Sequence, residues 1–265
     1  MGGGTVAVVH RFRHQNLLAR SATRATYTPY PYGGKAHPVQ RTTRFMTRLS
    51  IFRTPNLAAA NLTQLLLGGA WIPMWFFLNP YLQQGLGYSA CPSGAALLPM
   101  TVLIMLGMIA SAPRAIGRFR PKATTVAGLV LLTAGMAWLS LISPDGGFAT
   151  DVLPAGLVAA LGMSLAFIPS LGTAISSARP QGGGLASDIV NTSHQVGSAL
   201  ALAAMTAVAA ANGADRLGDL PALTGGFSAA FAGAAAIALL AALTAATTLR
   251  TSAPAPSEHA TASRI

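Results

Sequence analysis

Four polar side chains recur at helical spacing in an otherwise apolar part of the chain. The spacing is i, i+3, i+4 and i+7, which places all four on one side of an α-helix: Asp188, Asn191, Thr192 and Gln195. Such a face is suited to lining an aqueous path. For Asn191 and Gln195 the alternative is hydrogen bonding between helices. For Asp188 the alternative is a structural role in the first helical turn after glycines 182–184, where the helix dipole favours a carboxylate.

His194 lies on a different side of the same predicted helix. We expect it to form an interfacial or interhelical hydrogen bond. Proton exchange is the alternative, because imidazole titrates near neutral pH. Asp188 and His194 are therefore the candidate proton-coupling residues.

A second stripe combines amides with aromatic rings. Its members fall within about 80° of one another on a helical wheel: Asn61, Gln64, Gly68, Trp71, Trp75 and Asn79. Amides beside large aromatic faces suit bulky amphipathic ligands, so we expect this stripe to line a substrate cavity. The alternative for Trp71, Trp75 and Asn79 is an interfacial belt at the membrane edge, where Trp is enriched.

The composition predicts the elements that must position these residues. The 265-residue chain is 52% hydrophobic and 9% charged, whereas a soluble domain is about 25% charged. Six apolar stretches have the length of membrane-spanning helices: Leu57–Leu78, Ala90–Ala112, Ala123–Ile142, Val152–Ile175, Ala186–Ala211 and Phe227–Leu249. The fold class is therefore an all-α membrane protein. The third and sixth stretches hold almost only Ala, Leu, Gly and Thr, so we expect them to be peripheral.

The charges predict three segments and an orientation. We expect a basic, disordered leader over residues 1–53, a transmembrane domain over 54–250 and a disordered tail over 251–265. Sixteen of the 17 Lys and Arg residues lie in the segments that six spans place on one side, and only Arg216 lies on the other. Cytoplasmic segments are enriched in Lys and Arg. Both termini are therefore predicted to be cytoplasmic, in a multi-pass protein of the cell membrane.

Several other classes of function lack their characteristic residues. The net charge of +11 comes without a basic helix or interleaved aromatic residues, so nucleic acid is not an expected partner. The glycine runs lack the Lys-Ser/Thr of a phosphate-binding loop. Cys91 is the only cysteine, and the pair His10 and His14 lacks a third ligand. We predict no metal, no cofactor and no enzymatic activity, because no catalytic cluster is present.

Three stretches form a set with a matching spacing: Leu49–Leu57, Tyr81–Met100 and Gly184–Leu200. Together they resemble the C-terminal part of the fourteen-helix drug:proton antiporters of the major facilitator superfamily. The connection after the second span resembles a degenerate copy of that superfamily's cytoplasmic gate motif, in which a tight Gly turn and cations lock neighbouring helices. Its matching residues are Arg114, Gly117 and Arg118, and Pro113 stands where the motif has an Asp.

The resemblance implies one six-helix half of a transporter, built from two inverted three-helix repeats, Leu57–Ile142 and Val152–Leu249. It implies efflux of lipophilic or cationic small molecules by proton antiport when the transporter is complete. The family's antiporter motif and usual proton-carrying acids lie mainly in an N-terminal half, so we expect this chain to be truncated and its partner to be that missing half. The alternative is a non-transporting remnant or a membrane-embedded partner subunit.

Overall fold

The computed structural model describes residues 55–177 and 183–249, so the expectations for the leader 1–53 and the tail 251–265 lie outside the described residues. Every regular element in the described part is a helix. In chain order the elements are α2 (Pro55–Pro80), η2 (Tyr81–Gly85), α3 (Ala90–Ala96), α4 (Leu98–Leu106), η3 (Gly107–Ser111), α5 (Ala112–Phe119), α6 (Pro121–Leu139), η4 (Phe148–Val152), α7 (Leu153–Ser177), α8 (Gly183–Ala211) and α9 (Leu220–Thr248). The three η elements are short π-helical segments that continue neighbouring α-helices.

The described residues contain six helices long and apolar enough to cross a membrane, which confirms the predicted class. All six predicted stretches lie in these helices, apart from a residue or more at some of their ends. Five of the six helices have 29 or 30 residues, longer than their apolar runs. The second, for example, continues from Ala90 to Phe119 through α3, α4, η3 and α5. A helix can continue past the hydrocarbon core because its backbone groups are already paired internally.

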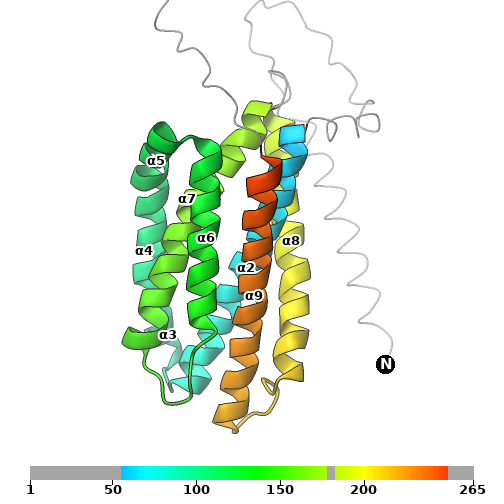
Figure 1. Ribbon diagram of the computed structural model, residues 1–265. Coiled ribbons are helices and arrows are strands. Elements are labelled where there is room, and N and C mark those ends of the chain that lie inside the picture. Colours follow the sequence, from blue (N-terminus) through cyan, green and yellow to red (C-terminus); the bar gives the residue numbers. More distant parts are fainter. Residues whose placement is uncertain (1–54, 178–182, 250–265) are drawn as a thin grey trace, which may run out of the picture. The chain divides into compact units, whose positions relative to one another are not determined.

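The helix contacts have an internal two-fold pattern (Figure 1). α2 contacts α8 and α9, and α7 makes the corresponding contacts with α4 and α6. Two further contacts, α2 with α7 and α6 with α9, join equivalent helices of the two halves. Exchanging the first three spans with the last three therefore maps these principal contacts onto one another, as expected for two three-helix repeats.

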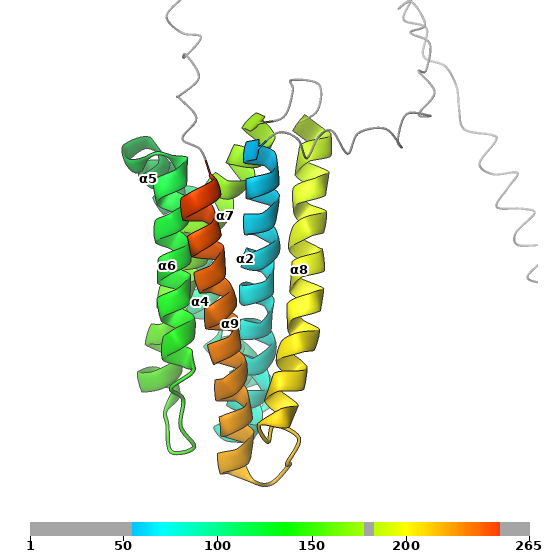
Figure 2. The ribbon, with the colours of Figure 1, turned by 45° about the vertical axis from the view of Figure 1, so that its right-hand side comes forward.

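Burial differs strongly among the six helices. In the most apolar stretch of each span, 61% of residues are buried in the first, 56% in the fourth, 44% in the third and in the sixth, 28% in the fifth and 17% in the second. The third and sixth spans, expected to be peripheral, are thus not the least buried of the described helices, although each keeps large exposed apolar side chains on one side, such as Trp138 on α6 and Leu243 on α9. The least buried helices are the second and fifth, and α8 stands at an edge of the group in both views (Figure 2).

Small residues explain how closely α6 packs on α7. A Cβ added at Gly128 would meet the backbone of α7 at Ala166 and Gly162, and one at Gly135 would meet Ala159 and Ala155. Within a bilayer, helices associate through close backbone approach at small residues rather than through apolar side chains. The Gly and Ala residues of α6 therefore provide the face that packs on α7.

Candidate functional site

The amide of Gln64 joins three helices. Its Nε2 donates to the backbone oxygen of Phe167 at 3.3 Å and to Ser170 Oγ at 3.0 Å, both on α7. Its Oε1 lies 3.2 Å from Nδ1 of His194 on α8. The Gln64 side chain is completely buried. It therefore acts as a polar junction between α2, α7 and α8.

The junction fixes which nitrogen of His194 carries a proton. The carbonyl of Phe167 can only accept, so the Gln64 NH₂ group must point towards α7 and its oxygen towards α8. Nδ1 of His194 is then the donor to Gln64 Oε1. The ring of Phe167 also packs edge-on against the imidazole, with centroids 5.6 Å apart. This agrees with the predicted interhelical hydrogen bond of His194 and leaves Nε2 as the site where a further proton can bind.

Most of the stripe on the first span is buried, contrary to expectation, and only Trp75 and Asn79 at its far end are accessible. Gln64 is 0%, Asn61 5% and Trp71 7% exposed. Asn61 accepts a hydrogen bond from Ser193 Oγ of α8 at 3.1 Å and donates to its own helix. Trp71 meets Trp75 edge to face, and Trp75 stays partly exposed. The physical reason is that α2 is packed between α7, α8 and α9, which enclose its polar face.

The stripe on α8, by contrast, is open. Its four members are all exposed: Asp188, Asn191, Thr192 and Gln195. Thr192 donates to the backbone oxygen of Asp188 at 2.8 Å. Within the described residues, the side chains of Asn191 and Gln195 make no hydrogen bond to another helix. The two polar stripes, which have similar helical spacing in the sequence, therefore differ in exposure: the one on α2 is mostly buried and the one on α8 is accessible.

Asp188 does not lie in the first turn of its helix. α8 begins at Gly183, and its first turn contains no acidic residue. The helix includes two of the three glycines that were expected to form a loop. Asp188 is therefore past the unpaired N–H groups that favour a carboxylate at a helix start, which weakens the structural explanation for its charge.

The predicted gate loop is mostly helical. Gly117 lies within α5, so it does not form the expected tight turn. The sharp change of direction comes at Arg120, whose φ is 69°. Arg114 donates to the backbone oxygen of Ala110 at 2.8 Å, and Arg118 lies over the ring of Phe119. Neither forms an ion pair in the part of the chain that the structure describes.

Three partners in the buried junction were not predicted from the sequence: Phe167, Ser170 and Ser193. Ser170 is fully buried and donates back to Ala166 of its own helix at 2.6 Å. A small hydroxyl in an apolar helix commonly marks a helix contact in membranes. That signal was present for Ser170, whereas nothing in the sequence distinguishes the carbonyl of Phe167.

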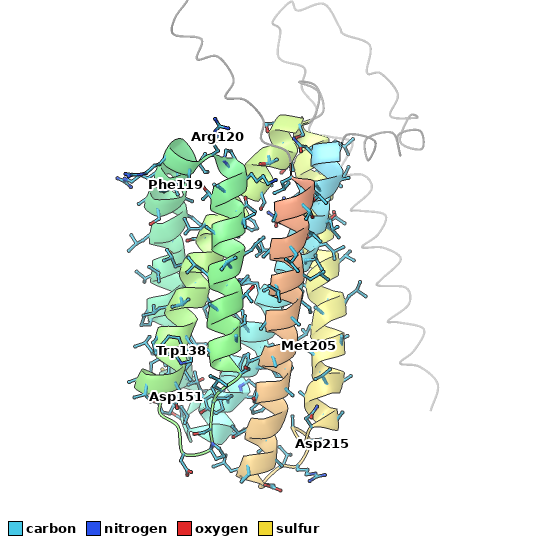
Figure 3. The ribbon with its side chains drawn as sticks, in the orientation of Figure 1. Phe119, Arg120, Trp138, Asp151, Met205 and Asp215 are labelled. Carbon is cyan, nitrogen blue, oxygen red and sulfur yellow. The ribbon has the colours of Figure 1, made fainter. Side chains whose placement is uncertain are left out.

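Charged residues lie at both ends of the helix group (Figure 3). Arg120 lies at one end, and Asp151 and Asp215 lie at the other. Among the described residues, no three His, Cys, Asp or Glu side chains are grouped as a metal site would need. The arrangement is a helical membrane unit with an exposed polar face, which defines the class as a multi-pass membrane protein.

Comparison with known proteins identifies the family. The family model described as Major Facilitator Superfamily matches residues 17–202. The chain belongs to the Major Facilitator Superfamily, whose members are membrane transporters.

Its relatives include antibiotic exporters. The chain is 30% identical over 158 residues to the cephamycin export protein CmcT of Amycolatopsis lactamdurans, which covers 60% of this chain and 32% of that protein. It is 35% identical over 148 residues to the puromycin resistance protein pur8 of Streptomyces alboniger, which covers 55% of this chain and 29% of that protein. It is 28% identical over 173 residues to a multidrug resistance protein B homolog of Mycobacterium tuberculosis, which covers 64% of this chain and 32% of that protein. The matched part thus spans about a third of the length of each relative.

Proposed function

We propose that this chain supplies one wall of the substrate cavity of a proton-coupled multidrug exporter in the cell membrane. The observation that supports the proposal is the exposed polar face of α8, with Asp188, Asn191 and Gln195 on a helix of membrane-spanning length. A polar or charged group costs a few kcal/mol in hydrocarbon. Contact with water or a ligand suits this face better than contact with lipid chains.

The proposed substrates are lipophilic or cationic small molecules. The names of two relatives refer to cephamycin export and puromycin resistance. On this chain, Asn191 and Gln195 offer donors and acceptors without a fixed charge, and Trp75 is partly exposed. Groups of this kind orient ligands of varied shape weakly, as a multidrug cavity requires.

Asp188 is the proposed proton-exchanging group. It is the carboxylate on the exposed face of α8, and no cation pairs with it among the described residues. His194 is the second candidate, because Gln64 holds its Nδ1 and leaves Nε2 to bind a proton. Proton antiport needs a group that substrate and proton reach alternately, and an exposed carboxylate fits that requirement.

Cysteine labelling tests the proposed wall. Asn191→Cys and Gln195→Cys, each in a Cys91→Ser background, should react in native membranes with a small water-soluble thiol reagent. Leu239→Cys is the matched control, because Leu239 is 48% exposed but lies on an apolar part of α9. We expect the first two variants to label and the control to stay unlabelled. Equal labelling of all three would contradict a special aqueous contact of α8.

The proposal also requires a second wall. Alternating access moves one unit against another around a site near the middle of the bilayer, and the relatives are about three times as long as the segment that matches them. We therefore propose that a second six-helix unit pairs with the one described. Residues 1–265 expressed alone in a drug-sensitive host should not extrude a lipophilic cationic dye. Uncoupler-sensitive extrusion abolished by Asp188→Asn would refute the need for a second unit.

The proposed orientation places the cationic end of the helices in the cytoplasm. Four cations cluster where the second and third spans meet, namely Arg114, Arg118, Arg120 and Lys122. Four acids lie in or beside the connections at the other end: Asp145, Asp151, Asp215 and Asp219. This asymmetry is the positive-inside pattern. A fluorescent reporter that folds only in the cytoplasm should therefore be bright when fused after Ile265. A dark fusion with an active periplasmic reporter at the same site would reverse the orientation.

A further inference from the structure

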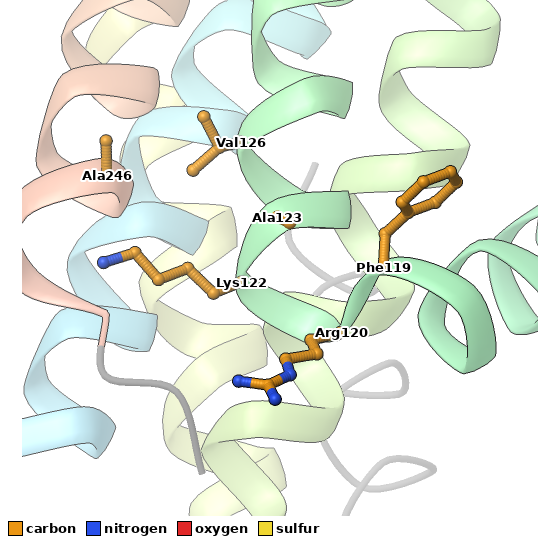
Figure 4. A pocket seen from close by; sticks show the side chains of 6 residues that line it. All are labelled: Phe119, Arg120, Lys122, Ala123, Val126 and Ala246. Carbon is orange, nitrogen blue, oxygen red and sulfur yellow. The ribbon is translucent and has the colours of Figure 1, made fainter. Parts of the chain in front are cut away.

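A groove of about 280 Å³ opens at the cationic end of the helices, between α6 and α9. Six of the described residues line it: Phe119, Arg120, Lys122, Ala123, Val126 and Ala246 (Figure 4). The lining combines two cations with apolar side chains, and Lys122 extends towards the side of the groove where Ala246 lies. We propose that this groove binds an anionic phospholipid, with its phosphate on Arg120 and Lys122 and the start of an acyl chain against Val126 and Ala246.

The charge at the groove is uncompensated in the described structure. Arg120 is exposed and Lys122 partly exposed, and neither forms an ion pair within residues 55–177 and 183–249. Asp151 and Asp215, in contrast, lie at the opposite end (Figure 3). Two cations close together at a membrane surface attract anionic lipid headgroups, and each contributes about fivefold to the affinity. A phosphate would therefore neutralise charge that the described residues leave unpaired.

The apolar side of the groove is what distinguishes a lipid from a free anion. Val126 is partly exposed, and Ala123 and Ala246 are exposed, on helices of membrane-spanning character. Lys122 is the second residue of α6, and Val126 is one helical turn further along the same helix. Cations at a helix end with apolar groups one turn deeper match an amphiphile that has its phosphate at the interface.

The backbone at Arg120 gives a second, independent indication of a binding site. Its φ of 69° and ψ of 154° lie in a region that side-chain-bearing residues rarely adopt. Glycine would relieve the strain at this position, yet an arginine occupies it. Strained positions of this kind gather at ligand sites, where the surrounding structure enforces them. The guanidinium is thus held at the mouth of the groove at a cost to the backbone.

The experiment measures lipid binding to the full chain purified in a mild detergent. Phosphatidylglycerol is titrated while the midpoint of thermal unfolding is followed, and native mass spectrometry counts the retained lipids. We expect a saturable rise in the midpoint with phosphatidylglycerol and little rise with phosphatidylcholine of the same chain length. Inorganic phosphate at matched concentration should also have little effect. A full shift with inorganic phosphate would overturn the lipid assignment in favour of a simple anion site.

Three variants separate the groove from general surface charge. Arg120→Gln combined with Lys122→Gln should weaken phosphatidylglycerol binding about thirtyfold, at about fivefold per cation. Ala246→Trp keeps both cations but fills the groove, and it should also abolish the saturable shift. Arg216→Gln, which removes a cation from the opposite end, should bind as the unmodified chain does. Unchanged lipid affinity in the double variant or in Ala246→Trp would overturn the proposal.

This inference does not depend on the proposed transport function. The groove lies on α6 and α9, whereas the proposed cavity wall lies on α8. A lipid site would therefore stand if α8 proved inaccessible to water, and the two experiments can fail separately.

Discussion

Replacing Gln64 by Leu tests the buried junction between α2, α7 and α8. Leucine has a similar volume and therefore leaves little cavity, so the change removes mainly polar contacts. Gln64 makes two hydrogen bonds to α7 and one to His194. Interhelical hydrogen bonds in membranes contribute on average about 0.6 kcal/mol and at most about 1.7 kcal/mol each. Gln64→Leu should therefore lower the free energy of unfolding by about 2 kcal/mol.

A double-mutant cycle with His194→Phe isolates the bond between the two side chains. Gln64→Leu leaves Nδ1–H of His194 without its acceptor, and His194→Phe removes that unpaired donor. The double variant should therefore lose about 1 kcal/mol less than the sum of the single losses. The assay is reversible unfolding in SDS titrated against a mild nonionic detergent. Additive losses, within about 0.3 kcal/mol, would refute the assignment of Nδ1 as donor to Gln64.

Thr206→Val is the matched control for this cycle. Thr206 is exposed, and its hydroxyl donates only to Leu202 of its own helix, at 2.8 Å. Its replacement should change the free energy of unfolding by less than about 0.5 kcal/mol. A loss as large as that of Gln64→Leu would indicate that any polar deletion destabilises the unit, and the junction would then have no special role.

Further predictions concern single backbone positions, all measured by the same unfolding assay. Gly197→Ala should cost about 1–3 kcal/mol, because a Cβ there meets backbone atoms of α2 that cannot move aside; Gly184→Ala, with nothing within 4 Å, should cost nothing. Arg120→Gly should raise stability in lipid-free detergent by about 1 kcal/mol, because it relieves the strained φ, and a loss would contradict the strain. Asp219→Ala should cost about 1 kcal/mol, because its carboxylate caps the first turn of α9, whereas Asp215→Ala should be neutral.

The six spans were predictable because the bilayer sets their length. Apolar runs of about 20 residues have few other interpretations, and each predicted run lies in an observed helix, give or take its ends. The helix ends were less predictable, since glycine tolerates both helical and turn conformations. Gly183 and Gly184 start α8 although the sequence predicts a loop there, and Gly117 lies within α5 although the sequence predicts a turn.

The role of each polar stripe could not be predicted from periodicity alone. Spacing shows that residues share a face, but it does not show whether that face meets water or another helix. Gln64 and Gln195 each belong to a polar stripe on a predicted span, yet Gln64 is fully buried and Gln195 is exposed. The difference comes from contacts between segments more than a hundred residues apart, such as Gln64 with Ser170. The groove at Arg120 was missed for the same reason, because Ala246 reaches it from the end of α9.

Accessibility along α8, measured with single nitroxide spin labels from residue 186 to 206, tests the central claim most directly. Collision with a water-soluble nickel chelate reports contact with water, and collision with oxygen reports contact with lipid. We predict chelate maxima at residues 188, 191 and 195, oxygen maxima at Val196 and Leu200, and low values for both at the buried Val190. Oxygen maxima at 191 and 195 would show that the polar face meets lipid, and would contradict the assignment of α8 as a cavity wall.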